Sequence, residues 1–206
     1  LSNRECLLYE RHQQIIAALS PPSTACYAPD GSISTEGVKA LTRHLIAKGV
    51  KGVYVGGVPS GECIYQHPDE RKAVLEAVMS EAKGKITVIA HVACNNTADS
   101  VELAAHAEKC GVDAIASIPP IYFHLPNYAI ADYWNAMSAA APNTEFIIYN
   151  IPQLAGTALT MPLLNEMLKN PTSSRSRTPR CPPRTSRCQG CRYSGARCGR
   201  FAVFKR

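Results

Sequence analysis

The sequence predicts an α/β fold in which crossover helices cover a parallel sheet. Short apolar runs alternate with amphipathic helical segments over residues 13–171, and each pair of segments takes up about 30 residues. Hydrophobic residues make up 46% of the 206-residue chain, which is enough to bury the core of one domain. This spacing fits both a (β/α) barrel and an open doubly wound sheet, and periodicity alone does not choose between them.

Each repeating unit is a predicted strand followed by a predicted helix. The strands are expected at residues 15–19, 50–55, 86–90, 113–118 and 145–149. The helices are expected at residues 35–48, 68–82, 97–110, 128–140 and 160–169. Gly49 and Gly111 end two of these helices, because glycine readily takes the left-handed conformation found at helix C-termini. Pro68 starts another, since its fixed φ suits the first helical turn.

The last part of the chain has a different composition. Residues 172–206 contain nine Arg, one Lys and no acidic residue, so they account for the formal net charge of +6. The periodic pattern stops at Pro171, and few apolar residues follow until Phe201. We therefore expect an N-terminal segment at residues 1–12, the repeating region at 13–171, and an aberrant, unstructured Arg-, Cys- and Pro-rich tail at 172–206.

The tail also carries the main alternative to an enzymatic function. Four of the nine cysteines lie in it, at Cys181, Cys188, Cys191 and Cys198. They could bind zinc in a ribbon that contacts nucleic acid. Their outer spacings are not those of a common zinc finger, and no helix or hairpin pattern surrounds them, so we expect neither a metal nor a nucleic-acid partner.

The rest of the chain predicts a soluble cytoplasmic protein without a membrane partner. No stretch approaches the roughly 20 apolar residues that a membrane-spanning helix needs. The other five cysteines are scattered, as buried cysteines of a reducing compartment are. His91 lies near Cys94, but two residues do not make a metal site, so we expect the histidines to be structural.

Parallel α/β proteins bind ligands on the loops that follow the carboxyl ends of their strands. The loop at residues 56–62 contains glycines and Ser60, which could hold a carboxylate, although a tight structural turn fits it equally. Tyr149 ends the fifth strand, where its hydroxyl could relay protons or simply lie in the core. The loop at 119–123 could line a pocket or a subunit contact.

Several of these segments resemble one enzyme family in the same order. The matching segments are Val53–Gly57 with Ser60–Glu62, then Asp69–Arg71, Ile89–Val92 and Tyr149–Pro152. Together they resemble the dihydrodipicolinate synthase and N-acetylneuraminate lyase family of pyruvate-dependent class I aldolases. The resemblance implies a (β/α)8 TIM barrel, of which about five units are present here. It also implies a tetramer that acts on pyruvate through a lysine Schiff base, with no metal or organic cofactor.

The resemblance also assigns site residues. Gly57, Ser60, Gly61 and Glu62 would form the loop that holds the pyruvate carboxylate, and Tyr149 would shuttle protons. Tyr122 would lie near the barrel mouth or a subunit contact. Pro59 departs from the family's loop and removes one N–H donor from it.

The resemblance is closer to the lyase branch. Gln153 and Leu154 stand where synthases commonly have an arginine. The expected parent reaction is therefore retro-aldol cleavage of a 2-keto-3-deoxy sugar acid of the sialic acid type to pyruvate and an aldehyde. Condensation of pyruvate with an aldehyde, as in the synthases, is the alternative.

The Schiff-base lysine of the family's sixth strand is missing. No lysine occurs between Lys169 and Lys205, so we expect this chain to be inactive. A frame error offers an explanation. Synonymous codons for residues 172–188, read one nucleotide earlier, can encode an apolar strand that ends in a lysine overlapping Ser176 and Arg177. The expected chain is thus a C-terminally truncated or frameshifted barrel.

Overall fold

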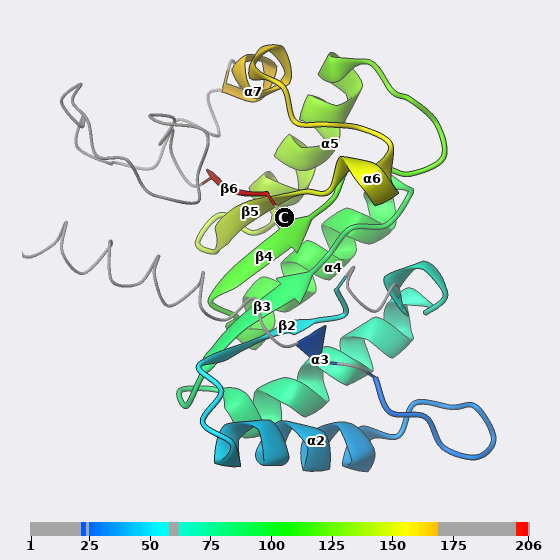
Figure 1. Ribbon diagram of the computed structural model, residues 1–206, viewed down its shortest axis with the longest axis vertical. Coiled ribbons are helices and arrows are strands. Elements are labelled where there is room, and N and C mark those ends of the chain that lie inside the picture. Colours follow the sequence, from blue (N-terminus) through cyan, green and yellow to red (C-terminus); the bar gives the residue numbers. More distant parts are fainter. Residues whose placement is uncertain (1–21, 24, 58–61, 169–200, 206) are drawn as a thin grey trace, which may run out of the picture.

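The strands of the sheet follow one another in chain order and all run parallel. The computed structural model describes residues 22–23, 25–57, 62–168 and 201–205 (Figure 1). The strands are β1 Pro22–Ser23, β2 Gly52–Val55, β3 Thr87–His91, β4 Ala114–Ser117, β5 Glu145–Asn150 and β6 Phe201–Lys205. Each is paired with the one before it. This order is that of a (β/α) barrel wall and excludes the doubly wound alternative, in which the strand order reverses.

Helices connect these strands and pack side by side along one face of the sheet (Figure 1). The longer ones are α2 Thr35–Ala47, α3 Pro68–Ala82, α4 Thr97–Cys110, α5 Asn127–Ala140 and α7 Met161–Leu168. The short elements are the 3₁₀ turn η1 Glu62–Ile64 and α6 Pro152–Ala155. Within the described ranges, no helix has the length and apolar character needed to cross a bilayer.

Local signals in the sequence explain where the helices begin and end. The Ser34 side chain accepts a hydrogen bond from the Gly37 N–H and so caps α2. Asn96 caps α4 in the same way, with its Oδ1 2.8 Å from the Asp99 nitrogen. At the other end of α4, Gly111 has φ +82°, a conformation that glycine adopts without strain.

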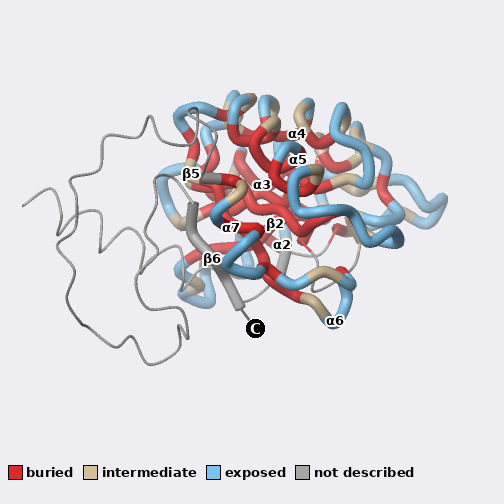
Figure 2. The backbone as a smooth tube through the Cα atoms, turned by 90° about the horizontal axis from the view of Figure 1, so that it is seen from above, coloured by how far each residue is buried: buried red, intermediate tan, exposed pale blue. Residues whose placement is uncertain are grey.

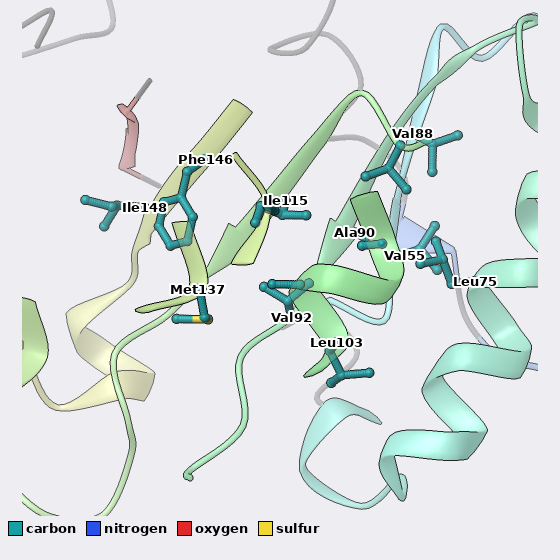
Figure 3. Packing of buried hydrophobic residues seen from close by; sticks show 14 of the residues in the cluster. Val55, Leu75, Val88, Ala90, Val92, Leu103, Ile115, Met137, Phe146 and Ile148 are labelled. Carbon is teal, nitrogen blue, oxygen red and sulfur yellow. The ribbon is translucent and has the colours of Figure 1, made fainter. Parts of the chain in front are cut away.

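The two faces of the sheet carry different side chains. On the face toward the helices, which we call the helix side, alternate strand residues such as Val55, Ile115 and Phe146 pack against Leu75, Met137 and other helix residues (Figure 3). The opposite face, which we call the inner face, carries a smaller buried cluster: Tyr54, Ile89, Ala114, Ala116 and Ile147. Figure 2 shows that burial concentrates along the strands and the sides of the helices that face them.

The five expected helices and the expected strands from residue 50 onward agree with those described to within two residues at each end, whereas β1 and η1 were not expected. The helices at 68–82 and 97–110 have the expected bounds. The expected strand at 15–19 lies outside the described residues, and the short helix α6 was not expected.

The expectation of an unstructured tail needs correction for residues 201–205. This run forms β6, which pairs parallel to β5 with Phe201 beside Phe146 and Lys205 beside Asn150. The physical reason is that β5 would otherwise be an open edge, and an apolar run can pair with it. The remainder of the tail lies outside the described residues.

Candidate functional site

Two tyrosines meet on the inner face near the carboxyl ends of the strands. Tyr149 of β5 is 7% exposed, and its ring centroid lies 5.9 Å from that of Tyr54 on β2, with a 35° tilt between the rings. β2 and β5 are not neighbours in the sheet, because β3 and β4 lie between them. The contact therefore means that the sheet is curved and that its inner face is concave, as in a barrel wall.

A buried hydrogen bond joins Tyr54 to His91. The Tyr54 hydroxyl lies 2.8 Å from Nδ1 of His91, the last residue of β3. The two rings meet edge to face, with centroids 5.9 Å apart. Tyr54 is 1% exposed and His91 is 5% exposed. Tyr54, His91 and Tyr149 thus form one group on the inner face, which we call the inner-face cluster.

Burial keeps the Tyr54–His91 pair uncharged. It raises the pKa of the Tyr54 phenol well above its usual value, and the nearby Tyr149 adds to this effect. It lowers the pKa of His91 well below 6.5, and the positive charge of Arg71 lowers it further. The hydrogen bond therefore joins a neutral phenol to a neutral imidazole at neutral pH.

Arg71 fixes the chain segment that leaves β3. It belongs to the first turns of α3 and is 5% exposed. Its guanidinium donates to the carbonyl oxygens of His91 and Ala93, at 2.7 and 2.8 Å, and to Sγ of Cys94 at 3.1 Å. The planar group thus binds this segment at three points and holds His91 at the strand end.

Part of the expected carboxylate loop is described. Gly57 is buried directly after β2, following Gly56 with φ +62°. Ser60 and Gly61 lie outside the described residues. Glu62 begins η1, and its Oε2 accepts a hydrogen bond of 2.9 Å from the Ala25 nitrogen. The described role of Glu62 is therefore to tie the segment after β1 to the segment after β2.

Tyr122 is exposed to solvent, unlike the buried Tyr54 and Tyr149. It is 87% exposed on the loop after β4 and has φ +85°, which is unusual for a residue with a side chain. Its ring meets that of Phe123 edge to face at 4.9 Å. Further exposed apolar side chains follow it in the chain, at Leu125, Tyr128 and Leu154.

The cysteines and histidines in the described ranges do not gather into a metal site. No group of three or more His, Cys, Asp or Glu side chains that could hold an ion occurs there. Cys63 and Cys94 are partly buried, and burial raises the pKa of both thiols, which disfavours the reactive thiolate. The four cysteines of the tail lie outside the described residues.

Sequence reasoning predicted a role for Tyr149 but gave Tyr54 none, and it took His91 as structural. Tyr54 alternates with Val53 and Val55 on β2, and this alternation already places its side chain on the opposite face from theirs. The pairing with His91 joins residues 37 positions apart and could not be read from a local pattern.

Comparisons with known proteins point to one family. Residues 12–173 match the family described as the dihydrodipicolinate synthetase family. An N-acetylneuraminate lyase of Mediterraneibacter gnavus is 70% identical over 151 residues, covering 73% of this chain and 48% of that protein. One of Enterobacter sp. strain 638 is 38% identical over 157 residues, covering 76% and 51%. The chain thus spans about half the length of the curated relatives it matches.

Solved structures agree. Ruminococcus gnavus sialic acid aldolase, wild type and a catalytic lysine mutant, superposes with a TM-score of 0.70 at 70% identity, covering 74% of this chain and 50% of that chain. The CdNal protein of Clostridium difficile, solved in complex with mannosamine, gives a TM-score of 0.67 at 30% identity, covering 73% and 52%.

Proposed function

This chain belongs to the dihydrodipicolinate synthetase family, and from that membership we propose that its parent activity is a pyruvate-dependent lyase reaction. The substrate is a 2-keto-3-deoxy sugar acid of the sialic acid type, which is cleaved to pyruvate and an aldehyde. The observation that carries this proposal is the 70% identity to an N-acetylneuraminate lyase over most of the chain. Gln153 and Leu154, in place of a synthase arginine, favour cleavage over condensation.

Tyr149 is the proposed acid–base group. Retro-aldol cleavage removes a proton from a substrate hydroxyl while the carbon–carbon bond breaks and its electron pair moves toward the iminium carbon. A tyrosine on the concave face, at the carboxyl end of β5, is placed where the ligand of a barrel enzyme binds. The ring of Tyr149 packs beside that of Tyr54, which supports a defined position for it.

The loop after β2 is the proposed carboxylate site. Gly57 offers backbone next to the strand end, and Ser60, Gly61 and Glu62 complete the loop by family resemblance. The bond from the Ala25 nitrogen to Glu62 supports this assignment, because it anchors the far end of the loop. The proposed ligand is the carboxylate of pyruvate or of the sugar acid.

We propose that this 206-residue chain lacks lyase activity because it lacks the Schiff-base lysine. β6 takes the sixth place in the sheet, but its lysine, Lys205, pairs in register with Asn150, while Phe204 pairs with Tyr149. Asn150 follows Tyr149 and so belongs to the helix side by strand alternation. The strand position paired with Tyr149 is therefore occupied by Phe204, a residue type without an amine that could form a Schiff base.

The proposed subunit contact involves the exposed apolar loop after β4. Tyr122 and Phe123 are 87% and 71% exposed, and such aromatic side chains are enriched at protein interfaces. We propose a homo-oligomer, a tetramer in the intact family. Sedimentation of the chain and of a Tyr122→Ser, Phe123→Ser double variant tests this: the variant should shift to smaller species, and equal sedimentation argues against the contact.

Two experiments test the function. The first is borohydride reduction of the chain with pyruvate, followed by mass spectrometry. We expect no pyruvyl adduct, and an adduct on Lys205 would disprove the proposed inactivity.

The second experiment is a chimera that joins residues 1–168 to the remaining half of the Mediterraneibacter gnavus lyase. It should cleave N-acetylneuraminate, and its Tyr149→Phe variant should lose about 10²–10⁴-fold in kcat.

A further inference from the structure

The inner-face cluster contains a polar atom that has no partner among the described residues. Across that part of the chain, His91 Nε2 and Gln66 Oε1 are the two buried side-chain polar atoms without a hydrogen bond. Gln66 follows η1 and is not part of the cluster. His91 is only 5% exposed, so its free ring nitrogen is not compensated by bulk water.

The bond to Tyr54 determines what the free nitrogen can do. A neutral phenol is a better donor than a neutral imidazole N–H, and an imidazole nitrogen is a better acceptor than a phenol oxygen. The favoured arrangement therefore has the Tyr54 hydroxyl donating to Nδ1 over the observed 2.8 Å. In that tautomer Nε2 carries the hydrogen. The inner-face cluster thus holds a buried N–H donor that lacks an acceptor among the described side chains.

The described neighbours of His91 on the inner face do not supply an acceptor for its free nitrogen. Its register partner on β4 is Ala116, and Ala114 lies two residues earlier on the same face. The other members of the smaller apolar cluster on the inner face are Ile89, Ile147 and Tyr54. Of these, only Tyr54 has a polar side-chain group, and its hydroxyl is bonded to Nδ1.

We propose that His91 is a substrate-recognition residue, whose Nε2–H donates to an oxygen of the bound 2-keto acid while Nδ1 holds Tyr54 against Tyr149. This proposal rests on the proposed function, because that function supplies a small ligand rich in acceptor oxygens. The two ring nitrogens then have separate tasks. Nε2 contacts the ligand, and Nδ1 positions the tyrosine that packs on the acid–base group.

Two variants separate the two tasks. The side-chain amide of Asn occupies the place of Nδ1, and that of Gln reaches the place of Nε2. His91→Asn keeps a partner for Tyr54 but loses the ligand contact, whereas His91→Gln keeps a donor for the ligand. His106→Asn is the matched control, because His106 lies on α4 and bonds Glu76 away from the inner face.

The experiment is NMR titration of the whole chain with pyruvate, using ¹⁵N-labelled histidine and amide signals. We expect the His91 Nε2 resonance to move on pyruvate addition, and pyruvate affinity to fall at least about tenfold in His91→Asn, one tenfold step corresponding to one lost hydrogen bond. His91→Gln should retain more affinity than His91→Asn, and His106→Asn should bind like the unmodified chain. Circular dichroism checks that each variant is folded.

The possible failures are distinguishable. If amide signals near Gly57 and Tyr149 respond to pyruvate but His91 Nε2 does not, the role of His91 is disproved and the proposed function stands. Unchanged affinity in a folded His91→Asn variant leads to the same conclusion. If no signal responds to pyruvate, the role of His91 is disproved, and the proposed function is decided separately by whether the chimera cleaves N-acetylneuraminate.

Discussion

The helix side and the inner face of the sheet are built from alternate residues of the same strands, yet they differ in chemistry. On β5, Phe146 and Ile148 join the large cluster under the helices, whereas Ile147 and Tyr149 face inward. The strand residues that join the large cluster on the helix side are all apolar, and most are branched aliphatic or aromatic. The inner face carries alanines and the polar groups of the inner-face cluster.

This difference separates folding from function within single strands. Burying apolar side chains against helices is the main source of stability in such a domain. Burying a phenol and an imidazole is costly unless each is hydrogen-bonded, and a free nitrogen such as His91 Nε2 lowers stability by about 1–3 kcal/mol. The inner face therefore keeps groups that folding alone would not favour, as expected of a ligand site.

The largest expected effect comes from truncating a strand residue on the helix side. Ile148→Ala should lower the free energy of unfolding by about 2–5 kcal/mol, because Ile148 is fully buried under the helices. Ile147→Ala is the matched control, since it is the same change at the next residue with equal burial but on the smaller inner cluster. Its cost should be lower by about 1 kcal/mol. Equal costs in urea unfolding would show that the two faces contribute alike.

The next largest effect is expected at Arg71, which reaches from α3 to the segment after β3 and holds His91 at the strand end. Arg71→Met should cost about 1.5–3 kcal/mol, because the carbonyl oxygens of His91 and Ala93 lose a charged donor in a buried place. The neighbouring Lys72→Met removes only ion pairs at the surface of α3 and α4 and should cost no more than about 1 kcal/mol. Urea unfolding measures both, and a smaller loss in Arg71→Met than in Lys72→Met would refute the role given to Arg71.

The burial of the His91 imidazole should be visible in how the free energy of unfolding changes with pH. Burial lowers its pKa in the folded chain well below 6.5, so between these two values the unfolded chain binds a proton that the folded chain does not. Its contribution to stability is therefore present above pH 6.5 and is lost as the pH falls below that value. One proton limits this slope to about 1.4 kcal/mol per pH unit. Urea unfolding between about pH 7.5 and about pH 5.5 should show a shallower slope in His91→Asn, and an identical slope would contradict the assignment.

Most of the fold could be predicted because its signals are local. Pro68, Gly111 and the alternating strands each act within a few residues, so α3, α4 and the parallel direction of the strands follow from sequence, whereas the order of the strands was implied only by the family resemblance. The pairing of β6 with β5 could not be predicted, because it joins residues about 55 positions apart across a segment of unlike composition.

The candidate site could be predicted only in part for a similar reason. The position of Tyr149 at a strand end predicts either a proton relay or a core tyrosine, and the family resemblance is what favours the proposed acid–base role. Its contact with Tyr54 depends on the curvature of the sheet across four strands, and the bond from Tyr54 to His91 depends on register. Residue type alone sets neither contact. The family resemblance could therefore suggest a role for Tyr149, but it could not predict that Tyr54 and His91 support it.

The smallest expected effect on stability is at Tyr149, where the functional effect should be largest. Among the described residues its hydroxyl has no hydrogen-bond partner, so Tyr149→Phe removes no hydrogen bond to a described residue. The free energy of unfolding should change by less than about 0.5 kcal/mol, while the chimera described above should lose most of its activity. Tyr54→Phe is the matched control. It removes the hydroxyl that bonds His91 Nδ1 and should cost about 1–3 kcal/mol. A larger loss of stability in Tyr149→Phe than in Tyr54→Phe would show that the Tyr149 hydroxyl stabilises the fold. The distinction between a helix side that provides stability and an inner face that provides the ligand site would then be wrong for Tyr149, the residue on which the proposed chemistry depends.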